Sequence, residues 1–311
     1  IDVDGLTDLQ NEGVQFIPRL DSLKPLIDKI SQRILLNKLE IPGPQWMRLS
    51  SIDLHENKLP DNWQFPLMAK ASRGGYDGKG TRVIRDFREL NNFMKSVDQN
   101  LWFIEKWINY EKEYSLVASR DLKGQFRVFP LVETNQFNQV CDWVLAPAVV
   151  PHPVEVMAYN IAASLMTELD YCGVLAIEFF YGSCGLLVNE IAPRTHNSAH
   201  YSIEACTSSQ FDQQVCIVSG FPLTSPKLIV PGSLMINLLG LSKDSNSSLE
   251  TRLTEIRNID GANLHWYGKL EEKPGRKLGH VTFLLKREDP GLRRKEAMDL
   301  LKKIRSIWPV Q

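Results

Sequence analysis

The chain lacks a long apolar stretch and an excess of either charge. Its hydrophobic runs are short and are interrupted by proline, glycine or charged residues, whereas a membrane-spanning helix needs about 20 consecutive apolar residues. The 36 basic side chains are matched by 37 acidic ones, which argues against nucleic acid or an anionic membrane as the main partner. The sequence predicts neither a membrane protein nor a nucleic-acid-binding protein.

Cysteine is scarce and shows no pattern. No C-x-x-C pair or metal-ligand spacing occurs among Cys141, Cys172, Cys184, Cys206 and Cys216. We expect reduced and mostly buried thiols in a cytoplasmic protein. No Ser/His/Asp or reactive-cysteine pattern predicts a covalent nucleophile.

The two common phosphate-binding fingerprints are also missing. A strand predicted at Leu67–Lys70 runs into ASRGGYDGKG (Ala71–Gly80), which fits neither G-x-x-x-x-G-K-[ST] nor G-x-G-x-x-G. A glycine-rich hairpin that closes over a nucleotide is the remaining functional interpretation, and an inert surface turn is the alternative. The glycines of this predicted lid are Gly74, Gly75, Gly78 and Gly80.

The chain begins Ile-Asp-Val-Asp, without a methionine or a preceding signal peptide. The pattern predicts a helix over Val3–Glu12, a strand over Val14–Ile17 and a helix over Asp21–Ile30. These elements are too few to make a sheet. We therefore expect residues 1–30 to be the remnant of an N-terminal α/β domain whose first strands are absent from this sequence.

The most informative stretch consists of two apolar runs, Val174–Phe180 and Gly185–Ala192. The short Gly/Ser turn Tyr181–Gly185 joins them, so they predict a β-hairpin. A five-residue turn pairs Phe180 with Leu186, and that register places the even-numbered residues of both strands on one face.

Two carboxylates, Glu178 and Glu190, share that predicted face. Burying an unpaired charge costs roughly several kcal/mol, and a divalent cation such as Mg²⁺ offsets this cost when phosphate oxygens complete its shell. The alternative is that each glutamate pairs with an arginine or lysine from elsewhere. We favour the metal because the same strand end carries further oxygen-, phosphate- and anion-binding groups, namely Asn189, Arg194, His196 and Asn197.

The remaining patterns predict an α+β fold with antiparallel, twisted sheets. A helix over Ser31–Leu39 carries Arg33, whose charge could simply be solvated. Taken alone, Glu105 and Glu113 resemble solvated surface acids. Further helices are predicted at Phe87–Val97 and Val154–Leu169, and strands at Leu101–Glu105, Glu113–Ser119, Phe126–Glu133 and Val144–Val149.

Residues 221–311 differ from the rest, with short strands, a Pro274-Gly275 turn and a basic closing helix. We expect a small, mostly-β C-terminal domain. Lys269 and Arg276 flank the turn and could hold a phosphate, although a solvated basic loop is equally consistent with their spacing.

In order along nearly the whole chain, these pieces resemble the ATP-grasp superfamily and, within it, the 5-(carboxyamino)imidazole ribonucleotide synthases of de novo purine synthesis. The resemblance implies an ATP-grasp domain over residues 31–220, with its lid at about 60–107, between the N-terminal remnant and the C-terminal domain. The motifs that carry it are RGGYDGKG (73–80), EKWINYEKEYS (105–115), GVLAIEFF (173–180), NEIAPRTHNSAHYSIEA (189–205), SQF (209–211), LHWYGK (264–269) and PGRKLGH (274–280).

The resemblance also implies a role for each candidate residue. Magnesium would be bound by Glu178 and Glu190, and bicarbonate and carboxyphosphate by Arg194, His196 and Asn197. The ribonucleotide would be bound by Tyr76, Lys79, Lys269 and Arg276. ATP would be bound by Arg33, Lys70, Glu105, Lys106, Glu113 and Asn189.

The implied activity is ATP- and bicarbonate-dependent carboxylation of 5-aminoimidazole ribonucleotide by a cytoplasmic homodimer. The sequence departs from the family pattern at Thr195, usually proline, and at Ala199, usually glycine, and it lacks the α/β domain that precedes Ile1 in the family. Two alternatives stay open. One is another ATP-grasp ligase, such as a formate-dependent glycinamide ribonucleotide transformylase or a biotin carboxylase, and the other is a catalytically silent ATP-binding protein.

Overall fold

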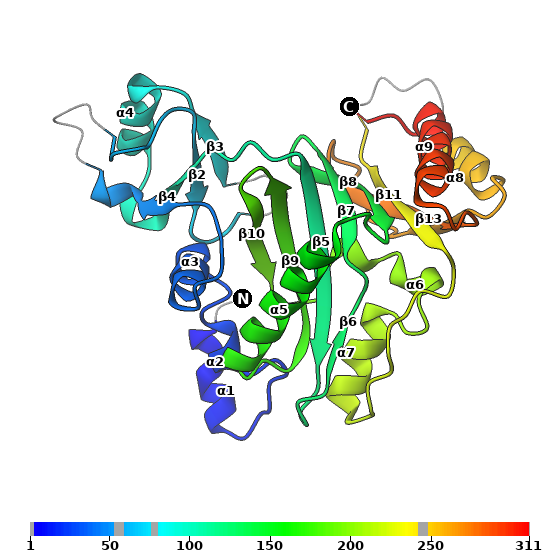
Figure 1. Cartoon of the computed structure of the whole chain (residues 1–311), viewed down its shortest axis with the longest axis horizontal. Helices are drawn as coiled ribbons and strands as arrows, with labels where there is room; N and C mark the ends of the chain where they lie inside the picture. Colours follow the sequence, from blue (N-terminus) through cyan, green and yellow to red (C-terminus); the bar gives the residue numbers. More distant parts are fainter. Residues whose placement is uncertain (1–2, 53–58, 76–79, 242–247, 311) are drawn as a thin grey trace. The chain divides into compact units, whose positions relative to one another are not determined.

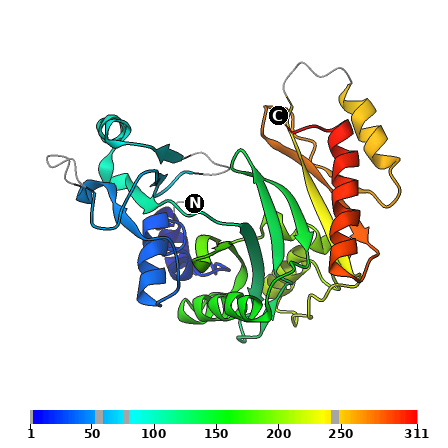
Figure 2. The same ribbon diagram turned by 45° about the horizontal axis from the view of Figure 1, so that its top comes forward.

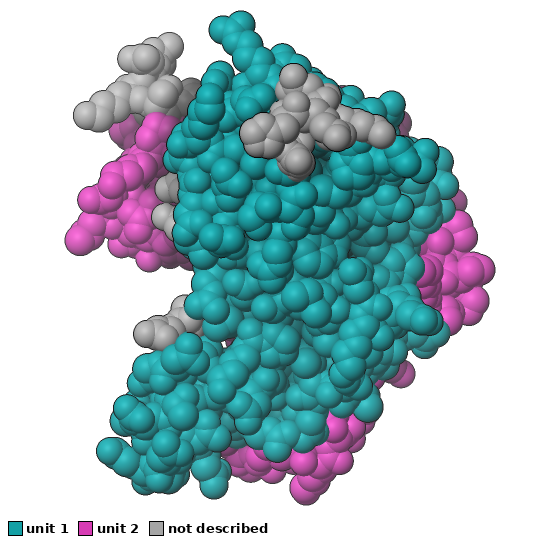
Figure 3. Space-filling model, turned by 90° about the vertical axis from the view of Figure 1, so that its left-hand side faces the viewer, with its two compact units in different colours: residues 1–113, 160–172, 177–193 teal, residues 114–159, 173–176, 194–311 magenta. Residues whose placement is uncertain are grey.

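The computed structural model of the chain describes residues 3–52, 59–75, 80–241 and 248–310. The chain divides into two compact units, coloured separately in Figure 3. Unit 1 contains residues 1–113, 160–172 and 177–193, and unit 2 contains residues 114–159, 173–176 and 194–311. Among the described residues, no helix combines the length and the apolar composition that crossing a membrane requires.

Unit 1 contains a four-stranded antiparallel sheet with the order β1-β4-β2-β3 (Figure 1). The strands are β1 (Trp46–Arg48), β2 (Leu67–Ala71), β3 (Thr81–Ile84) and β4 (Trp102–Lys106). The helices and short 3₁₀ turns of this part of the chain are η1 (Asp4–Leu6), α1 (Thr7–Asn11), α2 (Leu20–Leu23), α3 (Lys29–Lys38), η2 (Leu49–Ser51), α4 (Phe87–Ser96) and η3 (Gln99–Leu101).

Helix α4 covers the apolar side of this sheet. The Asp86 carboxylate caps its first turn by accepting from the Glu89 backbone N–H. The buried face of the helix, Leu90, Phe93 and Met94, recurs at helical spacing and packs on strand residues such as Leu67 and Ile104. This core holds β2 and β4 side by side, and both strands carry predicted site residues.

Unit 2 holds most of a nine-stranded sheet. Within unit 2 the strand order is β5-β7-β8-β11-β13-β12, and β6 pairs with β5. The strands are β5 (Lys112–Arg120), β6 (Phe126–Val128), β7 (Val132–Phe137), β8 (Val140–Ala146), β11 (Gly232–Leu239), β12 (Asn263–Trp266) and β13 (Lys277–Leu285). The helices are η4 (Asn197–Ala199), α6 (Ser202–Ala205), α7 (Gln210–Ser219), α8 (Leu249–Arg257) and α9 (Pro290–Ile307).

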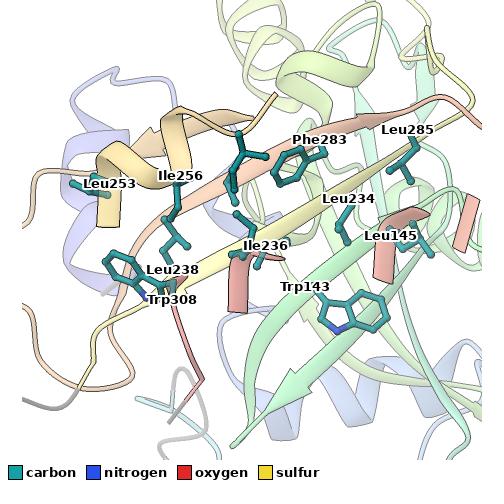
Figure 4. Packing of buried hydrophobic residues seen from close by; sticks show 14 of the residues in the cluster. Trp143, Leu145, Leu234, Ile236, Leu238, Leu253, Ile256, Phe283, Leu285 and Trp308 are labelled. Atoms are coloured by element: carbon teal, nitrogen blue, oxygen red, sulfur yellow. The ribbon is translucent and has the colours of Figure 1, made fainter. Parts of the chain in front are cut away.

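Helices α8 and α9 lie along β11 and β13 (Figures 1 and 2). These elements share one apolar core, which includes Ile256 of α8, Ile304 of α9, and Leu234 and Phe283 of the strands; Figure 4 shows part of it. Trp308 closes the core, and its indole N–H donates to the Leu239 carbonyl at 2.7 Å. This core supports β13, which brings Lys277 and His280 to the site described below.

Three further elements belong to the segment that crosses between the units along the sequence. These are α5 (His152–Glu168), β9 (Gly173–Gly182) and β10 (Gly185–Ala192). The predicted hairpin is therefore present, but its turn is wrong: the turn is Ser183–Cys184, two residues long, and not Tyr181–Gly185. A regular ladder from a two-residue turn would pair Gly182 with Gly185. The predicted pairing of Phe180 with Leu186 assumed a five-residue turn and is therefore no longer supported.

The α+β prediction with antiparallel sheets is confirmed. Near the start of the chain two predicted elements are wrong: Val14–Ile17 is irregular, and the helix predicted over Asp21–Ile30 is interrupted, because α2 ends at Leu23 and α3 begins separately at Lys29. Asp28 is the reason for the second difference, because its extended backbone ends the preceding turn and its carboxylate caps α3 through the Ser31 N–H. The domain boundaries at residues 30 and 220 stay a prediction.

Candidate functional site

A buried cluster of charges in unit 1 joins α3, β2 and β4. Arg33 donates from Nε to Glu105 Oε1 at 2.5 Å, and Lys70 Nζ approaches Glu105 Oε2 at 2.8 Å. The register explains part of this arrangement. Glu105 pairs with Met68 across β4 and β2, so it lies on the same face as Lys70, two residues further along β2.

The side chains of this cluster are buried: Arg33 is only 3% exposed and Glu105 only 2%. The alternative interpretation, in which the side chains of Arg33 and Glu105 are solvated, is therefore wrong. Burial alone would raise the pKa of Glu105, but the charges of Arg33 and Lys70 outweigh it and lower that pKa. Burial also lowers the pKa of Lys70, against the opposing effect of Glu105. Each charge is held in place by its neighbours.

The end of β10 reaches the same cluster. Asn189 accepts from Lys70 Nζ through its side-chain oxygen at 3.0 Å and from Arg33 Nη2 through its carbonyl at 2.6 Å. The next residue, Glu190, forms an ion pair with Lys29 at 2.5 Å. The pKa of Lys70 is lowered mainly by burial, and the charge of Glu105 opposes this. The charges of Arg33 and, to a smaller extent, Lys29 lower that pKa further.

A buried glutamine of α3 fixes the backbone just after these residues. Gln32 accepts from the Ile191 N–H at 3.1 Å and donates to the Ile191 carbonyl at 2.9 Å. Its amide also donates to the Leu26 carbonyl at 2.6 Å. The side chain thereby satisfies both backbone groups of Ile191.

The predicted metal ligands are both half-buried. Glu178 lies on β9 and Glu190 on β10, and both belong to unit 1. The alternation of burial along β10 breaks at Asn189 and Glu190, which lie between the buried Val188 and Ile191. That Glu178 and Glu190 share a face therefore stays a prediction. Among the described residues, no three His, Cys, Asp or Glu side chains come together as a metal site.

Of the other ATP residues, Lys106 ends β4 next to Glu105, and Glu113 lies on β5. Lys106 is 5.9 Å from the centre of the Trp63 ring. Glu113 is half-buried and accepts a hydrogen bond from Tyr110. Burial raises the pKa of the Tyr110 hydroxyl, and the Glu113 charge raises it further. The Tyr110 ring is stacked on Phe180 at 4.5 Å.

Only part of the lid belongs to the described residues. Gly74 and Gly80 have φ values of +79° and +86°, a backbone region that glycine adopts without strain. At Gly80 a side chain would also meet the Gly75 Cα at 3.0 Å. The predicted Tyr76, Gly78 and Lys79 lie outside the described residues.

In unit 2, the segment after β10 forms a second cluster. Arg194 is exposed and donates to the Thr195 carbonyl, whereas Asn197 is buried. The amides of Asn197 and Asn237 bond to each other at 2.7 and 2.9 Å. His196 begins the short η4 turn, where its Nδ1 accepts from the Ser198 N–H.

Two residues that had no role in the sequence interpretation complete this cluster. Gln210, fully buried at the start of α7, accepts from the His196 N–H at 2.7 Å and donates to the His196 carbonyl at 2.8 Å. The same amide nitrogen lies 3.0 Å from His200 Nδ1. His200 stands in the quoted HNSAH string and Gln210 in SQF, but nothing in those letters indicates that the two side chains meet.

Strand β13 and the loop before it supply further cations and rings. Lys269 donates to the Lys277 carbonyl at 2.6 Å and lies 5.4 Å from the Tyr267 ring centre. Arg276 donates to the Glu271 carbonyl at 3.2 Å. His280 is 2% exposed, and its Nδ1 bonds to the Tyr267 hydroxyl at 2.8 Å.

The pKa values of the histidines in this cluster are lowered. Burial lowers the pKa of His196 to about 3 and that of His200 to about 4, and the nearby Arg194 and Lys277 add to both shifts. Burial likewise lowers the pKa of His280 to about 2. Lys277 was missed as a site residue, and the PGRKLGH motif that contains it was the available signal. Unit 2 thus combines cations with uncharged donors, a combination suited to binding anions.

Comparison with known proteins gives a consistent result. The ATP-grasp domain family matches residues 34–211, and the phosphoribosylaminoimidazole carboxylase C-terminal domain family matches residues 233–294. The N5-carboxyaminoimidazole ribonucleotide synthase of Synechococcus elongatus is 41% identical over 309 residues, which cover 99% of this chain and 78% of that protein.

Solved structures of similarly named proteins share the fold. The N5-carboxyaminoimidazole synthetase of Staphylococcus aureus complexed with ADP has a TM-score of 0.84 and 31% identity, with 98% of this chain and 78% of that one covered. The N5-carboxyaminoimidazole synthase of Aspergillus clavatus, in complex with ADP and 5-aminoimidazole ribonucleotide, has a TM-score of 0.85 and 25% identity, with 99% and 79% covered.

Proposed function

Because the chain belongs to the N5-carboxyaminoimidazole ribonucleotide synthase family of ATP-grasp ligases, we propose that it carboxylates 5-aminoimidazole ribonucleotide with ATP and bicarbonate. The observation that carries this proposal is the 41% sequence identity to the Synechococcus elongatus enzyme over 99% of the chain. The buried Arg33–Glu105–Lys70 cluster supports it, because it places two cations and the Asn189 amide in one position in unit 1.

We assign ATP binding to unit 1. Arg33 and Lys70 neutralise phosphate charge, with Asn189 beside them, and the strand carrying Glu105 and Lys106 offers backbone groups to the adenine. Glu113 accepts from the ribose hydroxyls, and its hydrogen bond to Tyr110 holds the carboxylate in one orientation.

The donor set at the hairpin fits Mg²⁺. Glu178 and Glu190 are half-buried carboxylates, and Asn189 adds an amide oxygen, which is the oxygen-only chemistry that magnesium prefers together with substrate phosphate. Lys29 pairs with one oxygen of Glu190, so a cation already accompanies this carboxylate. When bound, the metal would neutralise charge on the ATP phosphates.

We assign the anion and the acceptor to unit 2. Arg194, His196 and Asn197 hold bicarbonate and the carboxyphosphate formed from it. Lys269 and Arg276 hold the ribonucleotide phosphate, and the proposal extends this role to Tyr76 and Lys79 of the lid. We also propose a cytoplasmic homodimer.

The reaction then runs in two balanced steps. A bicarbonate oxygen attacks the γ-phosphorus of ATP, the bond to the β-phosphate oxygen breaks, and ADP leaves. The exocyclic amine of the ribonucleotide then forms a C–N bond with the carboxyl carbon, phosphate leaves and the amine loses a proton. Carboxyphosphate also breaks down on its own to CO₂ and phosphate, so the side chains around it must hold it next to the amine until the C–N bond forms.

The direct test is ADP release by the protein, measured with each co-substrate omitted in turn. We expect release to require both bicarbonate and 5-aminoimidazole ribonucleotide. Release that depends on formate would point to a transformylase instead, and ATP binding without any turnover would point to a silent ATP-binding protein.

Glu190→Gln sharpens this test, because it removes the charge with little change in shape. We expect turnover to fall by about 100-fold or more while thermal unfolding stays cooperative. Glu168→Gln is the matched control in unit 1, since Glu168 also pairs with a lysine, Lys38, at 2.6 Å. That variant should keep its turnover, and equal losses in the two variants would contradict the assignment of Glu190.

A further inference from the structure

Two histidines of unit 2, His196 and His200, are tied to one buried amide whose orientation is determined by the backbone. The Gln210 oxygen accepts from the His196 N–H, and the Gln210 nitrogen donates to the His196 carbonyl. A backbone N–H can only donate and a carbonyl can only accept, so the amide cannot be turned around.

This orientation fixes the tautomer of His200. The second hydrogen of the Gln210 nitrogen points to His200 Nδ1 at 3.0 Å, so that ring nitrogen must accept. A neutral imidazole that accepts at Nδ1 carries its hydrogen on Nε2. The ring plane is held as well, because Phe211 stacks on His200 at 5.6 Å and His280 lies 5.0 Å away.

His196 has the same tautomer for a different reason. Its Nδ1 accepts from the Ser198 N–H at 3.4 Å and lies 2.9 Å from the Ser198 hydroxyl. That hydroxyl is in turn 2.7 Å from the Ser115 hydroxyl, which can donate to it. The hydrogen of neutral His196 is therefore also on Nε2.

We propose that His196 and His200 act as a pair of uncharged Nε2–H donors to one planar carboxylate-type group, that of bicarbonate or of the carboxyphosphate, and that Gln210 positions the pair through the His196 backbone and the His200 ring. This inference rests on the proposed function and adds two residues, His200 and Gln210, to it. Arg194 and Lys277, whose charges reach both rings, supply the positive potential.

Neutral donors suit this anion. A hydrogen bond from an uncharged imidazole stabilises negative charge without transferring a proton. The low pKa values of His196 and His200, about 3 and about 4, have burial as their main cause and keep both rings uncharged at neutral pH. His265 and His280 also face His200, and His265 is in turn paired with Glu204.

The first test is a two-bond ¹H–¹⁵N correlation spectrum of the whole protein with labelled histidine, at about pH 7.5. We expect the Nε2–H pattern for both His196 and His200, assigned through single variants. A His200 ring that is protonated on Nδ1, or on both nitrogens, would overturn the proposal. This readout needs no turnover.

The second test changes Gln210 to glutamate, which keeps the shape but has no hydrogen to donate to His200 or to the His196 carbonyl. We expect His200 to take up a hydrogen on Nδ1 and the KM for bicarbonate to rise about ten-fold, with the KM for ATP within about two-fold. Gln213→Glu is the matched control: Gln213 is equally buried on α7 and also makes three side-chain hydrogen bonds, none of them to a histidine. It should leave the histidine spectrum and both KM values unchanged.

The third test replaces His200 itself by its two amide analogues. Glutamine places its N–H near the Nε2 position and asparagine near Nδ1, so we expect His200→Gln to keep the KM for bicarbonate within about three-fold and His200→Asn to raise it about ten-fold. Equal KM values in the two variants would contradict the donor role, even if wild-type turnover depends on bicarbonate. If the wild type shows no bicarbonate-dependent ADP release, the proposed function is refuted. The histidine spectrum still tests the tautomers in that case, because it needs no turnover.

Discussion

The two units solve the problem of buried polar side chains in opposite ways. In unit 1, Arg33 and Lys70 form buried ion pairs with the same carboxylate, that of Glu105. In unit 2, His196, His200 and His280 avoid charge altogether, because burial keeps their pKa values far below neutral. The first arrangement is stable only while each buried charge keeps its partner. The second is stable as long as the pH is high enough that the histidines bind no extra proton.

The two clusters nevertheless share one device. A buried glutamine holds both backbone groups of one residue in each: Gln32 holds Ile191 in unit 1, and Gln210 holds His196 in unit 2. The residues held in this way lie on either side of the Pro193–Thr195 segment. The conformation of the chain is thus secured immediately before and after Arg194.

The largest effect is expected from breaking the charged cluster. Glu105→Ala leaves Arg33 and Lys70 buried without their common partner, which should lower the free energy of unfolding by about 3 to 5 kcal/mol. Urea denaturation followed by circular dichroism measures this. Glu250→Gln, in the exposed pair with Arg257, is the control and should cost no more than about 0.5 kcal/mol. Similar losses in the two variants would contradict the distinction between buried and exposed pairs.

An intermediate effect on stability is expected when acid protonates the buried histidines of unit 2. The pKa of His280 is about 2 in the folded protein and about 6.5 when unfolded. The unfolded chain therefore binds the extra proton first, and stability is lost as the pH falls below about 6.5. Between about pH 7.5 and pH 5 this single ring should cost about 2 kcal/mol.

His280→Asn isolates that contribution, because the amide cannot titrate and can still bond to the Tyr267 hydroxyl. The decrease in unfolding free energy between the two pH values should be smaller in the variant by the same amount. Urea denaturation of both proteins at each pH measures it. An identical pH dependence in wild type and variant would show that His280 is not held neutral by the fold.

The smallest effect concerns the helix that carries Gln210. Ser209 and Asp212 form a capping box at the start of α7, so Ser209→Ala should lower the free energy of unfolding by about 1 kcal/mol. Thermal unfolding measures this loss. Ser209→Thr keeps a hydroxyl that can accept from the Asp212 N–H and donate to the Asp212 carboxylate, so it should retain most of the stability, whereas equal losses in the two variants would contradict the capping role.

The order and type of most elements could be predicted from local patterns. The helix at Phe87–Ser96 and the strands at Leu67–Ala71 and Gly232–Leu239 follow from the spacing of their apolar residues and from their caps. The candidate residues were also visible, because Arg194, His196 and the glutamate pair stand in motifs of unusual composition. Charged and amide side chains beside apolar strands stand out in a single sequence, because such strands are otherwise apolar.

Other features were decided only by tertiary structure. Arg33 and Glu105 are 72 residues apart, and Gln32 and Ile191 are 159 apart, so no local pattern distinguishes these buried partners from solvated side chains. The turn of the hairpin is shorter than composition indicated, since Gly182 and Gly185 could each end a strand or belong to a turn. The tautomers of His196 and His200 depend on the amide of Gln210 and on Ser198, and only the folded chain brings those donors to the rings. Local propensity thus set the elements and the chemistry available, and long-range packing set which groups are charged, which are neutral and which meet.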